Sequence, residues 1–188
     1  EFEKLHVSDI KTGEEVKRSV FSRHFTFSGK YGPNLMEEVS RYALVASSIA
    51  QNNSFDVIHA HDWLTYPAGI AAKEITGKPL VVHVHATEFD RSGEHVNQPV
   101  YDIERRGMTE ADLVVTVSNL TRQIVIERYG IDPEKVITVH NAVEPVDRPG
   151  MEGVQKHVRE KIVTFLGRVT YQKGPDYFVE AAYKVLQR

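Results

Sequence analysis

Short, continuously apolar runs alternate with longer amphipathic or polar stretches along most of the chain. Unlike strands with one face in water, these runs do not alternate between apolar and polar side chains. Continuous apolar runs are typical of parallel strands whose faces are covered by helices. The five runs are residues 56–60, 80–84, 113–117, 136–139 and 162–166.

Helices are predicted between the runs. Leu35–Gln51 has apolar residues at helical spacing, and one face would hold Leu35, Val39, Tyr42, Ala43, Ala46 and Ile49. A second helix should end near Ile75, because Gly77 and Pro79 follow it as helix-ending residues often do. Residues 86–98 are predicted to form a long polar loop, and the first 34 residues are predicted to form short strands. Further helices are expected at 101–108, 119–129 and 177–186. The alternation predicts an α/β, Rossmann-like parallel sheet with helices on both faces.

Composition narrows the function classes. The 188 residues carry a net charge of -3, which argues against a general nucleic-acid binder. No cysteine is present, so a cytoplasmic protein is expected, and no apolar run approaches the ~20 residues needed to span a bilayer. Residues 144–160 hold two prolines, two glycines and seven charges, which is typical of a linker. The start, Glu1–Glu3, lacks methionine, so we expect a piece of a longer chain.

Polar residues follow the apolar runs at their carboxyl ends: His61 and Asp62, then His85, Ser118, Asn141 and Arg168. In open α/β sheets, ligands bind in the crevice at that edge. The repetition therefore predicts one site to which several strands contribute.

Two alternatives concern these strand ends. His59 and His61 share a strand face, as do His83 and His85, so four imidazoles could hold zinc. Histidines near strand ends more often form hydrogen bonds or contact ligands, and the inner pair, His59 and His83, could instead be packed core residues. Asp62 is also a good candidate for a helix N-cap, a role compatible with facing the crevice.

Residues 167–176 follow an apolar run and precede a helix that Pro175 would open. Helix amino ends attract phosphate, and Arg168 and Lys173 would add two positive charges. The order of residues is not that of a P-loop, and a solvated basic turn is the alternative.

Five segments follow one another along the chain: the His-Asp-Trp segment 55–63, the segment 81–88 around His85, the Ala-Asp…Ser segment 111–118, the Asn-Ala-Val turn 139–144 and the Gly-Arg…Lys-Gly stretch 165–174. In this order they resemble the motifs of the glycogen- and starch-synthase-like retaining glycosyltransferases. The resemblance runs from about Tyr31 to Arg188, and Ala142 departs from it where the family has glycine.

The resemblance implies a GT-B fold, in which two Rossmann-like domains face each other across a cleft. Residues 1–143 would be the acceptor-side domain without its start, 144–160 the linker, and 161–188 the beginning of the nucleotide-sugar-binding domain. The implied reaction is metal-independent, retaining transfer of a sugar, with glucose expected, from a UDP- or ADP-linked donor to a glucan or other glycan.

The resemblance also implies roles for seven residues, with no metal ligand and no cofactor. His85 and Asp62 would be catalytic; His61, Trp63 and Asn141 would bind substrate; Arg168 and Lys173 would bind the donor diphosphate. Two other functions stay open: a sugar-nucleotide epimerase of the same fold, and a binding fragment without turnover. A lone strand and helix at 161–188 would also favour a dimer or a domain swap.

Overall fold

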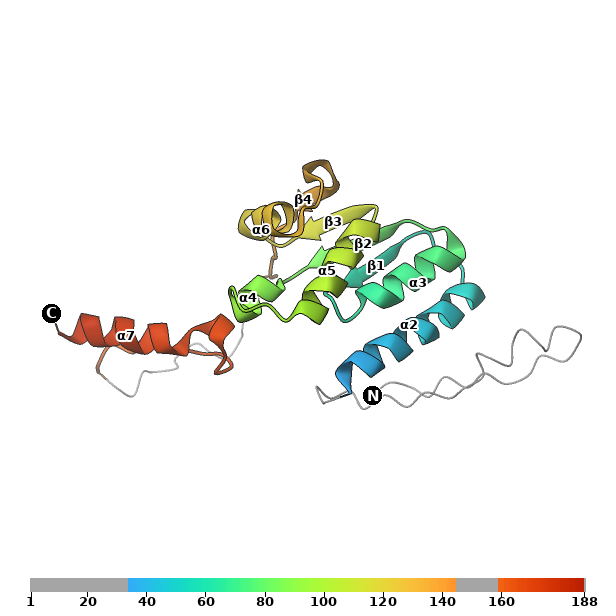
Figure 1. The fold of residues 1–188 in the computed structure, drawn as a ribbon. Helices are drawn as coiled ribbons and strands as arrows, with labels where there is room; N and C mark the ends of the chain where they lie inside the picture. The colour runs from blue at the N-terminus through green and yellow to red at the C-terminus, as the bar shows by residue number, and fades with distance from the viewer. Residues whose placement is uncertain (1–33, 145–158, 188) are drawn as a thin grey trace, which may run out of the picture.

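The computed structural model describes residues 34–144 and 159–187 (Figure 1). The short strands expected in the first 34 residues and most of the expected linker lie outside the described residues. The elements are α2 (Leu35–Asn52), β1 (Ile58–His61), α3 (Tyr66–Thr76), β2 (Leu80–Val84), α4 (Glu88–Ser92), α5 (Gln98–Glu110), β3 (Leu113–Thr116), α6 (Asn119–Tyr129), η1 (Pro133–Lys135), β4 (Val136–Thr138), η2 (Tyr171–Lys173) and α7 (Pro175–Leu186).

The four strands form one parallel sheet in the order β1-β2-β3-β4. Ala60 pairs with Val82, Val82 with Val114, and Val114 with Val136. β2 has the predicted bounds, whereas β1 begins two residues later than predicted and includes His61. The predicted α/β class, a parallel sheet flanked by helices, is confirmed.

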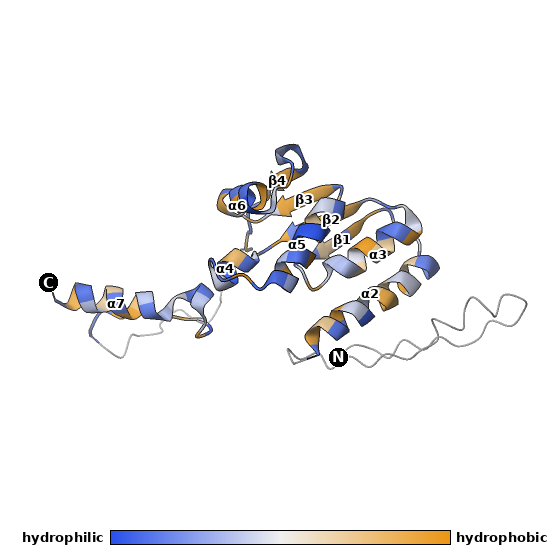
Figure 2. Cartoon of the chain, in the orientation of Figure 1, coloured by the Kyte–Doolittle hydropathy of each residue, from blue (hydrophilic) through white to orange (hydrophobic). Residues whose placement is uncertain are grey.

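The apolar core lies between this sheet and the helices α3, α5 and α6. Tyr66, Met108 and Val125 from these helices join Val82 and Val114 in one cluster. In Figure 1, α3 and α5 lie side by side over the strands, and Figure 2 shows β3 and β4 mainly in the colour of hydrophobic residues.

The two faces of the sheet are covered to different extents. On the core side, Leu80, Val82 and Val84 are buried. On the other side, His59 and His61 are exposed and His83 is half-buried. The apolar runs predicted the strands correctly, but they did not distinguish a fully covered face from one that carries histidines.

Asp112 joins three elements at the amino edge of the sheet. One of its carboxylate oxygens accepts a hydrogen bond from the Leu80 backbone N–H at 2.7 Å, and Lys73 Nζ lies 2.8 Å from the same oxygen. The hydrogen bond from Lys73, followed by that from Leu80, lowers the pKa of Asp112. The Asp of the Ala-Asp…Ser motif therefore has a structural role, in which it fixes α3 and the starts of β2 and β3 to one another.

Helix boundaries follow local signals. Gly77 takes a left-handed conformation (φ 67°) and its N–H donates to Lys73 O at 2.8 Å, as predicted for a helix-ending glycine. The predicted polar loop 86–98 was wrong in part, because α4 forms within it. Thr87 and Asp90 make a capping box that satisfies the first N–H groups of this short helix.

The segment 159–187 contains η2 and α7 but no strand among its described residues. The predicted strand 162–166 was therefore wrong. Val163 is 80% exposed and Leu166 96% exposed. A strand needs a hydrogen-bonding neighbour, and no strand among residues 34–144 pairs with this segment. α7 begins at Pro175, as predicted. None of the described helices combines the length and the apolar character needed to cross a membrane.

Candidate active site

The site lies where the parallel strands β1 and β2 end side by side. His61 is the last residue of β1, and His85 follows directly after β2. His61 Nδ1 lies 3.0 Å from His85 Nε2, and Asp62 Oδ1 accepts a hydrogen bond from the His85 N–H at 2.8 Å. The structure thus brings together the three residues that the strand-end pattern placed in one crevice.

Asp62 has an unusual backbone conformation. Its φ of 58° is positive, which aspartate adopts more readily than most other residues but which still carries strain. Its N–H donates to His83 O at 3.0 Å, and its C=O accepts from the Thr65 N–H at 3.0 Å. Strained residues of this kind are often found at functional sites.

The N-cap interpretation of Asp62 was wrong. The N-cap of α3 is Thr65, and its hydroxyl donates to the carbonyls of His61 (2.7 Å) and Asp62 (3.2 Å). The Asp62 carboxylate instead crosses to β2 and holds the backbone of His85. Ser118, in contrast, caps α6 by accepting from the Thr121 N–H at 3.0 Å, so its strand-end position serves the fold.

His59 and His83 lie on the same sheet face as His61 and His85. The ring centroids of His59 and His83 are 5.5 Å apart, and those of His83 and His85 are 4.3 Å apart. Burial, together with the charges of neighbouring histidines, lowers the pKa of both His59 and His83. The interpretation of the inner pair as packed core residues was wrong for His59, which is exposed.

A buried ionic network supports the chain directly after His85, and the sequence analysis did not foresee it. Arg91 donates to the carboxylates of Glu88 and Glu104, two side chains that are almost completely buried. Glu88 also accepts from the Asn97 N–H at 3.0 Å, and the Tyr129 hydroxyl donates to Glu104. The network therefore ties α4, α5 and α6 together below the strand end.

The two buried carboxyl groups differ in pKa. Burial raises the pKa of Glu104, and this outweighs the hydrogen bonds that it accepts. Burial would also raise the pKa of Glu88, but hydrogen bonds from Ser92, the Asn97 N–H and Arg91 lower it overall. Glu104 stands four residues after Val100 and four before Met108, on the buried stripe of α5. A charge on such a stripe was the signal that could have revealed the network.

The remaining candidates lie in different surroundings. Trp63 is half-buried and packs against the core cluster, while Asn141 is exposed three residues beyond β4. Arg168 and Lys173 are both exposed, and the Lys173 side chain folds back next to Gly167. In the part of the chain that the structure describes, neither cation forms a hydrogen bond or an ion pair with His61, Asp62 or His85.

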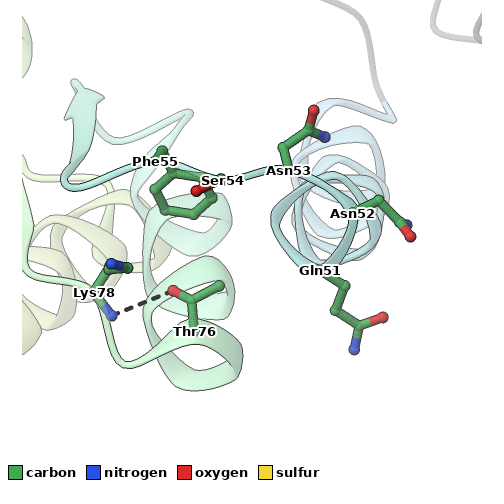
Figure 3. A pocket seen from close by; sticks show the side chains of 7 residues that line it. All are labelled: Gln51, Asn52, Asn53, Ser54, Phe55, Thr76 and Lys78. Carbon is green, nitrogen blue, oxygen red and sulfur yellow. Dashed lines mark hydrogen bonds between the residues drawn. The ribbon is translucent and has the colours of Figure 1, made fainter.

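A hollow of about 340 Å³ lies at the other edge of the sheet. As Figure 3 shows, it is lined by the end of α2, the residues leading into β1 and the turn after α3, where the Lys78 N–H donates to Thr76 Oγ1. Phe55 and Lys78, which line it, precede β1 and β2. The hollow thus lies at the amino edge, away from His61 and His85, and contains none of the predicted site residues.

Comparisons with known proteins agree on one class. Residues 13–146 match the family described as Glycosyltransferase Family 4. An uncharacterized glycosyltransferase of Methanocaldococcus jannaschii is 31% identical over 151 residues, which are 72% of this chain and 38% of that protein. The D-inositol 3-phosphate glycosyltransferase of Mycobacterium tuberculosis is 29% identical over 182 residues, which are 89% of this chain and 38% of that protein.

Among solved structures, Anabaena HepE in complex with UDP-glucose matches with a TM-score of 0.43 and 22% identity, over 60% of this chain and 28% of that one. The chain spans about 38% of the length of the two sequence relatives.

Proposed function

We propose, from the premise that this chain belongs to Glycosyltransferase Family 4, that it is part of an enzyme that transfers a sugar from a nucleotide-sugar donor to a glycan acceptor. The observation that supports the proposal is the junction of His61, Asp62 and His85 at the carboxyl edge of a parallel sheet. That edge is where open α/β sheets bind ligands.

In the proposed site, His85 holds the donor sugar. The Asp62 carboxylate sets the position of His85 by accepting a hydrogen bond from the His85 backbone N–H. His61 contacts Nε2 of the His85 ring. The Nδ1 atom of His85 is then the ring nitrogen available to a sugar hydroxyl. A side chain fixed from two directions loses little freedom when the substrate arrives, which is what preorganised catalysis requires.

The donor diphosphate is assigned to Arg168 and Lys173. Their two exposed cations precede α7, a helix without a side-chain cap at its start. Fixed positive charges that face a leaving diphosphate stabilise the negative charge that develops in the transition state. Transfer would then need no metal ion. Retention at the anomeric carbon, a UDP- or ADP-linked donor and glucose as the sugar are part of the same proposal.

A donor screen on the complete protein tests the function. UDP-glucose and ADP-glucose are each offered with and without a glucan, and the released nucleotide is measured. We expect acceptor-dependent release that falls about 10²–10³-fold in His85→Ala, the loss typical of removing one preorganised contact. His95→Ala, which changes an exposed histidine outside the site, is the matched control and should keep the wild-type rate.

The alternatives give different results in the same screen. An epimerase would convert the sugar nucleotide without releasing nucleotide. A binding fragment would retain glycan and release nothing from any donor. Either result, or equal rates in His85→Ala and wild type, would contradict the proposed transfer.

A further inference from the structure

Three histidine rings meet on the less covered face of the sheet. Side chains two residues apart on a strand share a face, so His59 and His61 point the same way from β1. His83 on β2 pairs directly with His61. The centroids of His59 and His61 are 4.3 Å apart, and those of His61 and His83 are 5.1 Å apart. One ring nitrogen from each of the three lies within 4.8 Å of the others.

Among the described residues, His83 lacks the partners that a buried imidazole needs. Both of its ring nitrogens are buried, and neither forms a hydrogen bond with any part of the chain that the structure describes. A neutral imidazole offers one N–H donor and one acceptor nitrogen, and buried polar groups in proteins almost always find a partner. A cation bound beside His59 and His61 would provide a partner for the acceptor nitrogen of His83.

His61 is already oriented by a hydrogen bond. Its Nδ1 atom lies 3.0 Å from His85 Nε2. With the Nδ1 proton in that bond, the lone pair of His61 is on Nε2 and can bind a metal. A ligating histidine normally donates its other ring N–H to a neighbour in this way, which fixes both its tautomer and its ring orientation.

We propose that His59, His61 and His83 bind a Zn²⁺ ion, with water as the fourth ligand. Zinc takes imidazole nitrogens at about 2.0–2.1 Å in tetrahedral geometry, so its ligand atoms lie about 3.3 Å apart. With His61 held by His85, rotation of the exposed His59 ring would bring its nitrogen toward that distance from the 4.8 Å span of the three atoms. A set of neutral nitrogens without a carboxylate selects zinc over magnesium or calcium.

The site goes beyond the proposed function and does not rest on it, because metal binding is measured without a sugar. The two nevertheless share His61. An ion on His61 would occupy the face at which the donor is proposed to bind, so zinc should inhibit transfer in the complete enzyme. In that enzyme, His59→Gln should relieve the inhibition and leave the rate without zinc unchanged.

Calorimetric titration of the 188-residue chain with Zn²⁺ tests the site. We expect one ion per chain in the wild type. His59→Gln and His83→Gln should each weaken binding by more than about 100-fold, since loss of a ligand costs more than loss of a residue that only orients one, which typically costs about 10–100-fold. His95→Gln, an exposed histidine away from the cluster, is the matched control and should bind like the wild type.

Thermal unfolding is the second readout. A ligand that binds only the folded chain raises its melting temperature, so Zn²⁺ should raise that of the wild type and of His95→Gln. It should not raise that of His59→Gln, whose exposed side chain can be replaced without disturbing the core. Absence of binding in the wild type, or wild-type affinity in His59→Gln, overturns the proposal whether or not His83→Gln folds.

Discussion

At the scale of single residues, Asp62 combines strain with a precise contact. Its positive φ turns the chain sharply after β1, and the turn brings the carboxylate to the backbone of His85. Other residues with a β-carbon adopt this positive φ only at a higher cost, and without a short polar side chain they could not accept the His85 N–H. The conformation of one aspartate therefore ties the end of β1 to the residue that follows β2.

Two substitutions of Asp62 test the importance of its conformation and of its contact with His85. Asp62→Asn keeps an oxygen acceptor and tolerates the left-handed conformation, so we expect a loss of less than about 1 kcal/mol in the free energy of unfolding. Asp62→Ala leaves the His85 N–H unpaired and adds conformational strain, and should lose about 2–3 kcal/mol. Chemical denaturation measures both. Equal stability of the two variants would show that the carboxylate does not hold His85.

The cations Arg168 and Lys173 are predicted to act in catalysis rather than in folding. Both are exposed, so Arg168→Ala and Lys173→Ala remove little packing. In the complete enzyme, each substitution should lower the transfer rate about 10²–10³-fold, as for removal of one contact to developing charge. The exposed Gln172→Ala is the control in the same turn. Unchanged kinetics in either cation variant would contradict the assignment of the diphosphate site.

At the scale of elements, close helix contacts determine how the helix layer covers the sheet. Gly69 of α3 lies over Ala60 and Leu80, and Gly107 of α5 lies against Tyr66 of α3. A β-carbon at Gly107 would come within 2.6 Å of Tyr66 Cβ, an atom that no side-chain rotation can move away. Glycine therefore allows α3 and α5 to approach each other.

Gly107→Ala tests this contact. Alanine is favoured over glycine in a helix by about 1 kcal/mol, but overpacking of a core costs about 1–3 kcal/mol. Because the clash involves atoms fixed to the backbone, we expect the upper part of that range and a net loss of about 1–2 kcal/mol. Arg105→Ala, on the exposed side of α5, should be neutral or slightly stabilising. Greater stability of Gly107→Ala in denaturant titrations would contradict a tight contact.

The Asp112 junction predicts a pH dependence of stability. Its pKa is lowered in the folded chain, so its contribution is present above the unfolded value of about 3.9 and is lost as pH falls through the folded pKa. The side chain is about half exposed, so we expect less than about 1 kcal/mol at neutral pH. Wild type and Asp112→Asn should therefore differ in unfolding free energy near neutral pH and converge in acid. A difference that stays constant down to about pH 2.5 would refute this.

At the scale of the whole molecule, the segment 159–187 and the sheet domain meet at a small contact. The Tyr171 hydroxyl of η2 lies 3.1 Å from where a β-carbon would stand on Gly93, directly after α4. Beyond this contact, Ile162, Val163 and Leu166 remain exposed, as does much of α7, including Val179 and Val185. Exposed apolar surface of this kind marks an interaction site or an aggregation liability.

We therefore predict that the isolated 188-residue chain self-associates through 161–188, as a dimer or a domain swap. Light scattering over a dilution series should show a mass that falls toward the monomer as concentration decreases. The double substitution Val163→Glu, Leu166→Lys should shift the chain to the monomer, and Gln172→Lys should not. A strict monomer at all concentrations would show that the exposed side chains do not pair between chains.

The local sequence pattern was sufficient to predict much of this fold. Four of the five apolar runs are strands, and Gly77 ends its helix, because burial and backbone conformation at these positions depend on nearby residues. The same strands, once parallel, place His61 and His85 at one edge, so their proximity also followed from the pattern. In α2, by contrast, the predicted apolar face was wrong in part: Ile49 is exposed, and Ala50 contributes to the packed face instead.

Tertiary structure alone decided which partners the polar residues find. The register that pairs His61 with His83 is set by the burial of Val82 and its neighbours, and no feature of the histidines themselves reveals it. The turn at Asp62 and the pairing of Arg91 with Glu104 likewise depend on elements distant in sequence. For the same reason residues 162–166 form no strand. An apolar run becomes a strand only when another strand satisfies its backbone hydrogen bonds, and the sheet of this molecule lies elsewhere.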